Sequence, residues 1–467
     1  MILLQLLTAL FLPWLLGVAW LRIGWSRTTR GAGPLVLGYA YLLGMLATTL
    51  IMRLWDAVGL KQAFWPLAGL FLALTLVGFW MSRTSTRQSD GYVDNSTVHS
   101  WDSWQTGLFA LLLALLAIRF VNLGLEILWR PLYPWDAWTT WAPRAQVWFA
   151  LKELVPFVDS TTWLHHPSRD IYTLPAWSYP ETVSLIQLWI SLALEQWDDS
   201  LINLPWLFCA AALGLAFYGQ LRLWGLAPLA GLLGSYLLLS LPLLNTHTAL
   251  AGYADLWLAA TYSLAGMAFL QWLRNGDPWQ GGLALLLALA CPLIKREGLI
   301  WMFTFLPPLL IACLPFRTRL LAGAGGAALL AIWYVSGGIR IGEFQLTPDV
   351  IQIPSLGRFE ILLQGGWEPF QQNLLVLDNW HLLWYLVIPI VIFSIPLMIA
   401  RRQRLIGLTF IGSGLVVIFG TFFLTDNAAW AEFYTSINRI LLHWAPLLLF
   451  YVLVLLQASH PGQPLKQ

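Results

Sequence analysis

The sequence has little charge. Asp, Glu, Lys and Arg make up 10% of its 467 residues, against about a quarter in soluble domains. Hydrophobic residues make up 58%, so polar side chains are too few to cover an ordinary globular surface. The net charge of +2 is too small to indicate a nucleic-acid partner. The composition therefore excludes a typical soluble protein and predicts an all-α polytopic membrane protein.

Cysteine is also scarce, and the common catalytic motifs are absent. Cys209, Cys291 and Cys313 lie in apolar runs and form no CxxC pair, which excludes a disulfide framework. No P-loop, dinucleotide-binding fingerprint or HExxH motif is present. The first apolar run, residues 2–21, has no basic leader and no small-residue cleavage site. It predicts a retained span rather than a signal peptide.

Long apolar runs are what the sequence has instead. A run of about 20 apolar residues is long enough to cross a bilayer as a helix. About 13 transmembrane helices are predicted in this way. They cover residues 2–21, 34–54, 63–81, 105–127, 201–221, 227–246, 251–272, 279–294, 298–314, 318–336, 380–400, 405–424 and 438–457.

The short loops that carry Lys and Arg predict the orientation of the chain, because such loops stay in the cytoplasm. An N-terminus outside and a C-terminus inside puts the basic loop residues on the cytoplasmic side. These are Arg22, Arg27, Arg30, Arg83, Arg87, Arg222, Arg274, Arg317, Arg319, Arg401, Arg402, Arg404 and Lys466. The arrangement requires that residues 180–196 form an interfacial or re-entrant helix rather than a span. It leaves two large outward loops, 128–200 and 337–379.

Tryptophan is unusually frequent, with 29 residues. One explanation is the aromatic belt at the two membrane interfaces. The other is stacking of indole faces on sugars or lipid headgroups. The clustering of the residues must decide between them.

The first outward loop opens on the motif Trp135-Asp136-Ala137-Trp138. Pro134 and Asp136 predict a turn and a helix N-cap, followed by an amphipathic helix on the membrane surface. Its apolar face would carry Trp138, Trp141, Trp148 and Phe149. Its wet face would carry Arg144, Lys152 and Glu153. Asp136 is then either the cap of an interfacial anchor or a general base, with Trp135, Trp138 and Trp141 as sugar-stacking candidates.

Three further outward places carry ionisable residues at membrane depth, where such residues are costly and default to function. They are Gly252-Tyr253-Ala254-Asp255, Lys295-Arg296-Glu297-Gly298, and Asn438-Arg439 with His443. A bound lipid phosphate would explain the cations. The alternatives are a solvated hairpin tip that pairs its own charges and, for Arg439, snorkelling to the interface. The adjacent His165 and His166 favour ordinary loop polarity over a metal site.

At these residues the chain resembles the GT-C superfamily of membrane glycosyltransferases. It is most similar to the family of protein O-mannosyltransferases and the lipid A aminoarabinose transferase. The matching features follow in order over roughly 105–457. They are the Trp135–Trp138 motif, Tyr179-Pro180-Glu181, Gly252–Leu256, Lys295–Gly298 and the Arg439…Pro446 pattern.

The resemblance implies a role for each matched residue. Asp136 would be the catalytic base, and Asp255 would line the same cavity. Substrate or lipid-phosphate binding would involve Arg144, Tyr253, Asp255, Lys295, Arg296, Glu297, Arg439 and His443. Many relatives carry a paired Asp-Glu in the first loop, and here the second position is Ala137. No metal ligand is therefore assigned, although a divalent metal stays possible as a cofactor.

The resemblance also implies a division of the chain. Residues 1–104 would hold three transmembrane helices and a cytoplasmic linker, in which the sequon Asn95-Ser96-Thr97 is incidental. Residues 105–336 would form the catalytic membrane core, including loop 128–200. Loop 337–379 would recognise the acceptor, and residues 380–467 would add the C-terminal helices.

Three functions compete for this pattern. The first is an inverting glycosyltransferase of a bacterial-type plasma (inner) membrane. It would move a sugar from a polyprenyl-phosphate donor to a lipid, glycan or protein acceptor on the extracytoplasmic face. The second is a transporter or flippase for a lipid-linked or amphiphilic anionic substrate. The third is a non-catalytic structural subunit.

Overall fold

The structure is a computed structural model that describes residues 2–24, 32–84, 101–166, 168, 170–353, 357–362, 366–399, 402–434 and 436–458. The sequon and the predicted cytoplasmic residues Arg27, Arg30, Arg87, Arg401 and Lys466 lie outside them. The chain forms two compact units. Unit 1 comprises Met1–Leu264 with Leu456–Gln467, and unit 2 comprises Ala265–Leu455. Unit 1 takes in residues 1–104 together with the following 160, so the compact units do not follow the division predicted above.

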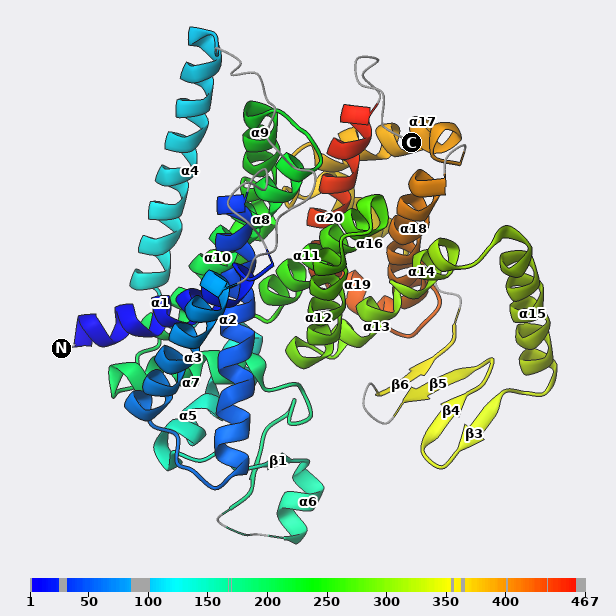
Figure 1. The fold of residues 1–467 in the computed structure, drawn as a ribbon. Coiled ribbons are helices and arrows are strands. Elements are labelled where there is room, and N and C mark those ends of the chain that lie inside the picture. Colours follow the sequence, from blue (N-terminus) through cyan, green and yellow to red (C-terminus); the bar gives the residue numbers. More distant parts are fainter. Residues whose placement is uncertain are drawn as a thin grey trace. The chain divides into compact units, whose positions relative to one another are not determined.

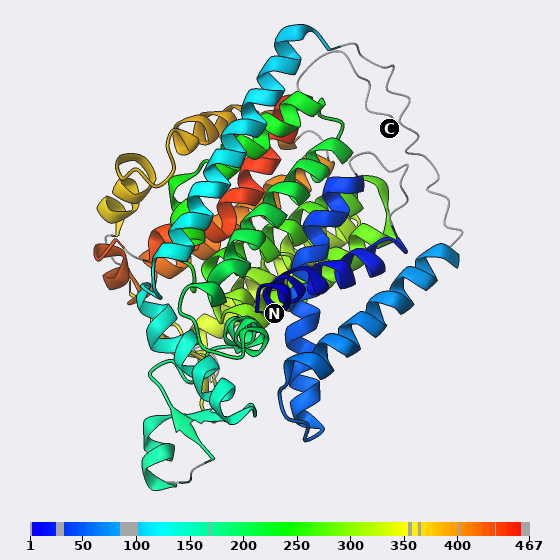
Figure 2. The ribbon, with the colours of Figure 1, turned by 90° about the vertical axis from the view of Figure 1, so that its left-hand side faces the viewer.

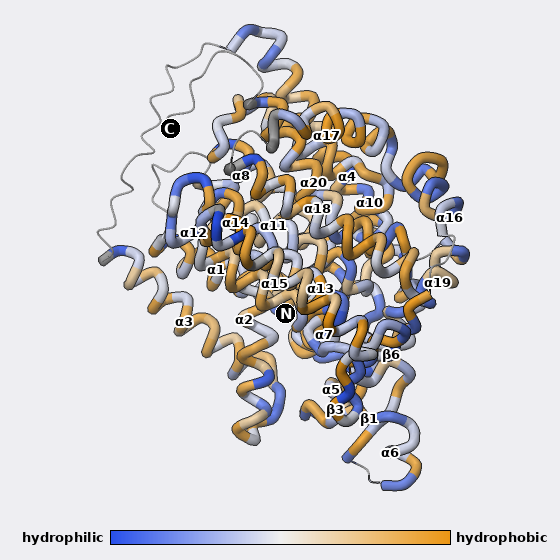
Figure 3. Tube along the Cα trace, turned by 90° about the vertical axis from the view of Figure 1, so that its right-hand side faces the viewer, coloured by the Kyte–Doolittle hydropathy of each residue, from blue (hydrophilic) through white to orange (hydrophobic). Residues whose placement is uncertain are grey.

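The described part of the chain contains nine helices that are long and apolar enough to cross a membrane. They confirm a multi-pass, mainly helical membrane protein. The nine are α1 (Ile2–Leu21), α2 (Ala32–Ala57), α3 (Phe64–Thr84), α4 (Ser103–Trp129), α8 (Leu204–Leu223), α11 (Asp255–Asn275), α15 (Phe316–Val335), α18 (Arg402–Phe423) and α20 (Ile437–Ala458). Figure 3 shows the apolar character of these helices in orange.

The other four predicted spans are bent, broken or short, and proline accounts for two of the breaks. α9 (Pro228–Leu239) and α10 (Pro242–Ala249) meet at 64°, because Pro242 has no N–H to continue the helix. Pro307 and Pro308 follow the break between α13 (Glu297–Phe303) and α14 (Leu306–Cys313). α12 (Pro278–Ile294) and α17 (Leu383–Ile399) have 17 residues each. Each is about 26 Å long, against a hydrocarbon core of about 30 Å.

Helix α7 (Thr182–Leu194) is the segment that was predicted not to span. Its 13 residues reach only about 20 Å, in agreement with that prediction. Every one of them is buried, however, so α7 does not lie on a membrane surface as an interfacial helix. It packs against α1, where the Trp189 indole donates to the Ala9 carbonyl and the Gln5 amide donates to Glu195. The N-terminal helices are therefore part of the packing around the first predicted outward loop.

The rest of unit 1 is formed by short elements of that loop and the helices after it. They are η1 (Ala137–Trp141), α5 (Ala142–Leu151), β1 (Phe157–Val158), α6 (Ser160–His165), β2 (Tyr172–Thr173) and η2 (Leu201–Asn203). β1 and β2 pair in parallel, with Phe157 opposite Tyr172. Figure 2 shows α6 and this strand pair projecting beyond α5 and α7, and no residue of α6 is buried.

Unit 2 contains a four-stranded antiparallel sheet that the sequence reading missed (Figure 1). Its strands, in spatial order, are β3 (Ile339–Ile341), β4 (Phe344–Leu346), β5 (Val350–Ile353) and β6 (Gly357–Glu360). Ile341 pairs with Phe344 across the two-residue turn Gly342-Glu343, and Gly342 supplies the positive φ of 57° that such turns need. Unit 2 also holds α16 (Trp367–Gln371), η3 (Gln372–Val376) and α19 (Ala428–Glu432). The predicted acceptor loop 337–379 is thus partly a sheet.

Candidate functional site

Asp136 lies at the start of a helical segment that begins with a widened turn. The segment η1 is a π-helix, and the Ala142 N–H donates to the Ala137 carbonyl five residues earlier. Pro143 follows directly and has no N–H to donate, which favours a widened turn before it. Asp136 has helical φ and ψ angles, and its side chain makes no capping hydrogen bond. The predicted N-cap is therefore wrong, and the carboxylate is half-exposed in the first turn.

Gly252 brings the two predicted acidic motifs together within unit 1. Its φ is +109°, and a Cβ atom on it would lie 2.6 Å from the Ala137 Cβ atom. Only glycine allows both this backbone conformation and this close approach. Asp136 and Asp255 are therefore on adjacent segments, each one to three residues from the contact. The Trp206 indole fixes the second segment by donating to the Tyr253 carbonyl at 2.7 Å.

The two members of the second motif differ in exposure. Tyr253 is half-buried, and its ring lies 5.2 Å from that of His247. Asp255 is 0% exposed at the start of α11. The side chain of Asp255 is thus closed to solvent, and its role at the substrate cavity stays a prediction. Its position in the first turn suits a carboxylate, since the positive end of the helix dipole lies there.

The predicted wet face of this segment is wrong for Arg144, whereas Glu153, just after α5, is exposed. Arg144 is 1% exposed, and Trp141 and Trp148 are buried as well. The Arg144 guanidinium donates to the carbonyls of Trp177 at 2.6 Å and Tyr179 at 2.8 Å, with Ala176 at 3.5 Å. These bonds turn Arg144 inward. The prediction that Arg144 faces headgroups is therefore wrong, and its role in lipid-phosphate binding stays a prediction.

The environment of Arg144 makes its charge costly. Burial lowers the pKa of the Arg144 guanidinium to about 10, and the Glu181 carboxylate opposes this shift. The guanidinium carbon also lies 5.3 Å from the Phe157 ring centroid. A buried charge is tolerated when it is hydrogen-bonded, and these carbonyls bind both terminal nitrogens of the guanidinium, whereas its Nε atom is buried without a partner.

The three tryptophans that were predicted to stack on sugars divide into two groups. Trp135 and Trp138 are exposed, and their rings meet edge to face at 4.9 Å. Trp141 is buried against Tyr179 and receives a hydrogen bond on its carbonyl from Ser184. Trp141 therefore cannot stack on a sugar, whereas Trp135 and Trp138 remain candidates beside Asp136.

This division predicts different effects of the same substitution. We expect Trp141→Ala to lower the free energy of unfolding by about 3–5 kcal/mol, because it leaves a large cavity in a closed site. Trp138→Ala, at a side chain that is 47% exposed, should change stability by less than half as much. Thermal unfolding in detergent measures both. Equal losses of stability would contradict the division.

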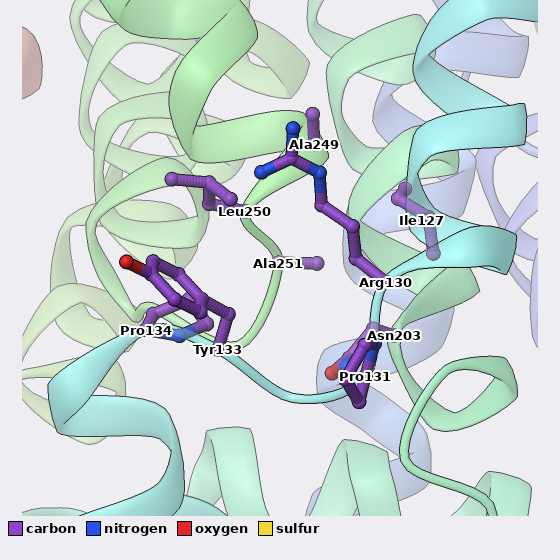
Figure 4. A pocket seen from close by; sticks show the side chains of 9 residues that line it. All are labelled: Ile127, Arg130, Pro131, Tyr133, Pro134, Asn203, Ala249, Leu250 and Ala251. Atoms are coloured by element: carbon purple, nitrogen blue, oxygen red, sulfur yellow. The ribbon is translucent and has the colours of Figure 1, made fainter.

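A small pocket lies beside this turn. It is lined by Ile127, Arg130, Pro131, Tyr133, Pro134, Asn203, Ala249, Leu250 and Ala251. Figure 4 shows Arg130 and Tyr133 at its border. Its volume of about 10 Å³ holds about one water molecule and no sugar ring. The sequence analysis did not identify Arg130 as a residue near the candidate site, because a cation at the end of a span is typical of an anchor at the membrane interface. It forms a 2.6 Å ion pair with Glu126.

The predicted cationic motif of unit 2 is partly closed. Lys295 is buried, and its Nζ atom lies 3.2 Å from a carboxylate oxygen of Glu297. The motif therefore pairs its own charges, as one of the alternatives predicted, but its lysine is buried rather than solvated. The contact of Lys295 with a lipid phosphate stays a prediction. Arg296 and Glu297 are half-exposed.

The last predicted motif lies on α20. The His443 ring is fully buried, and its Nδ1 atom accepts a hydrogen bond from the Trp301 indole at 3.0 Å. A nitrogen that accepts carries no proton, so this arrangement holds a neutral ring. The role of His443 in substrate or lipid-phosphate binding stays a prediction. Arg439, one turn earlier, is half-exposed.

Among the residues that the structure describes, no group of three or more His, Cys, Asp or Glu side chains could hold a metal ion. His165 and His166 are exposed, and the His165 ring bonds to the Thr161 carbonyl. Comparisons of the chain with protein-family models, curated proteins and solved structures found no match.

Proposed function

We propose that this multi-pass membrane protein is an inverting GT-C-type glycosyltransferase. It transfers a hexosyl or pentosyl group from a polyprenyl-phosphate donor to a lipid, glycan or protein acceptor. The reaction takes place on the extracytoplasmic face of a bacterial-type plasma membrane. The observation that carries the proposal is the contact between Gly252 and Ala137, which joins the two acidic motifs in unit 1.

Asp136 is the base of the proposed reaction. Its carboxylate takes the proton of an acceptor hydroxyl, and the acceptor oxygen forms a bond to the anomeric carbon. The bond from that carbon to the phosphate oxygen breaks on the opposite face, and polyprenyl phosphate leaves with the electron pair. Attack opposite the leaving group inverts the anomeric centre.

The surroundings of Asp136 support this role. Its carboxylate is half-exposed, while its turn is fixed by Gly252 and by the buried Trp141. Catalysis requires a reactive group that is held firmly and still reaches the substrate. The exposed pair Trp135 and Trp138 offers aromatic faces next to it. The phosphate-binding roles of Arg296 and Arg439 stay predictions.

A transporter is the second candidate, and the bent pair α9 and α10 favours it. Broken helices mark the substrate sites of many transporters. The two helices meet at 64°, and Asn245, Thr246 and His247 lie in α10, just after the break. Asn245 has a buried side-chain oxygen without a hydrogen-bond partner.

One assay separates the two functions. The purified protein is reconstituted in proteoliposomes with a radiolabelled polyprenyl-phosphate sugar and an extract of envelope lipids, glycans and proteins. The proposal expects label to pass to an acceptor with inverted anomeric configuration. Movement of intact labelled donor between leaflets, with no transfer, would instead establish the transporter.

A further inference from the structure

The buried arginine of α5 belongs to a larger arrangement that surrounds the Asp136 turn. Residues 174–179 form two overlapping turns, in which Trp177 donates to the Leu174 carbonyl and Tyr179 to the Ala176 carbonyl. The turns present three carbonyl oxygens to the Arg144 guanidinium. A planar guanidinium can bind several acceptors at once, whereas an ammonium group acts as a point charge.

A second arginine, on α2, holds the chain just after these turns. Arg53 lies 3.6 Å from a carboxylate oxygen of Glu181 and 3.4 Å from the Thr182 hydroxyl. Glu181 and Thr182 begin α7, and Ser184 in the first turn of α7 donates to the Trp141 carbonyl at 2.8 Å. The contacts run from α2 through the start of α7 to η1, which follows Asp136.

The end of α2 also holds the segment that follows α5. The Asp56 carboxylate accepts a hydrogen bond from the Leu154 amide at 2.8 Å. The backbone N–H of Gln62 donates to the Lys152 carbonyl at 2.8 Å. Both ends of the connection from α5 to α7 are therefore bound by α2 and the loop that follows it. Arg144 binds the turns at 174–179, between these two ends.

From these contacts we propose that Arg144 and Arg53 are positioning residues that form a clamp on the Asp136 turn. The N-terminal helices, through Arg53 and Asp56, are then part of the scaffold of the site. The clamp is a property of the fold, whereas its effect on turnover rests on the proposed function. Neither guanidinium is assigned a contact with the reacting atoms.

The clamp predicts a particular kinetic effect of Arg144→Lys. The variant keeps the positive charge and most of the volume but cannot bind three carbonyls in the same geometry. A displacement of about 1 Å in a catalytic group can cost about 100-fold in rate. We expect kcat for sugar transfer to fall by about this factor with KM changed less than threefold. Arg53→Lys should cost about tenfold in kcat, because it keeps one ionic contact.

Hydrogen exchange tests the clamp without any sugar donor. In nanodiscs, Arg144→Lys should raise amide exchange by about tenfold in residues 135–151 and 174–182, with no change in α20. Arg317→Lys is the matched control, because Arg317 is exposed at the start of α15 and belongs to none of the predicted site motifs. It should change neither the rate nor the exchange.

The outcomes are distinguishable. Unchanged exchange in both segments for Arg144→Lys and Arg53→Lys overturns the clamp. Raised exchange with unchanged kcat overturns the positioning role. If Arg144→Lys raises amide exchange throughout the protein, the variant is unfolded. Arg53→Lys then tests the clamp by amide exchange in the same two segments and by kcat. A wild-type protein that transfers no sugar overturns the proposed function, and the exchange data still test the clamp.

Discussion

Replacing Asp136 with Asn should reduce sugar transfer by at least about 1,000-fold and leave the protein folded. The substitution keeps the size of the side chain and removes its ability to accept a proton. General-base catalysis contributes about 100- to 10,000-fold to enzymatic rates, so its loss falls in this range. Asp136 is half-exposed and Asn has nearly the same size, so the packing should be kept and stability should change little. Initial rates of transfer in proteoliposomes measure the effect.

Two further variants sharpen this test. Asp136→Glu keeps the carboxylate but moves it by one methylene group, so we expect activity between those of the wild type and Asp136→Asn. Asp102→Asn is the control, because Asp102 is an exposed carboxylate at the start of α4, where Asn caps a helix as well as Asp does. It should retain full activity. Unchanged transfer in Asp136→Asn would remove Asp136 from the mechanism and favour the structural or transporter hypotheses.

Replacing Gly252 with Ala should reduce transfer by about 100-fold. The new methyl group would lie 2.6 Å from the Ala137 Cβ atom and 3.3 Å from Leu132 Cδ1. Carbon atoms in contact prefer a separation of about 3.5–4.0 Å, so the segments must move apart by about 1 Å. The Asp136 turn moves with Ala137, and a displacement of this size accounts for the loss. Steady-state kinetics should show it mainly in kcat.

A double variant and a control isolate the steric cause. Gly225 has a similar φ of +97° but no atom within 4 Å of an added Cβ. Gly225→Ala therefore carries the backbone strain without the contact, and it should lose little activity. Ala137→Gly combined with Gly252→Ala removes the opposing methyl group and should recover at least tenfold of the lost rate. No recovery would show that the contact does not position Asp136.

The helical membrane architecture could be predicted from the sequence, since apolar length alone determines whether a helix can span. Nine of the predicted spans, including 2–21 and 438–457, recur as single long helices. The sheet at 339–360 was missed because a search for long apolar runs does not detect strands of three or four residues. Alternation of Ile339, Ile341, Phe344 and Leu346 around Gly342-Glu343 was the signal that could have revealed it.

Burial in the first loop could not be predicted in the same way. The position of Arg144 on the polar face of a predicted amphipathic helix indicated contact with water. In the structure, three backbone carbonyls from the turns at 174–179 are its partners instead. Those carbonyls have no signature in the side-chain sequence. The same holds for Trp141 and Trp148, whose apolar character fits an interface and a protein interior equally well.

The sequence by itself determined that this chain belongs in a membrane, because too few polar residues exist to cover it in water. It also identified Asp136 and Asp255 as carboxylates in unusual places. Only the tertiary structure decided which charged side chains are exposed and which of the predicted motifs lie next to each other. Gly252 meets Ala137 from more than 100 residues away, and Lys295 and His443 are covered by partners. Such contacts depend on the packing of distant backbone segments, which local periodicity does not encode.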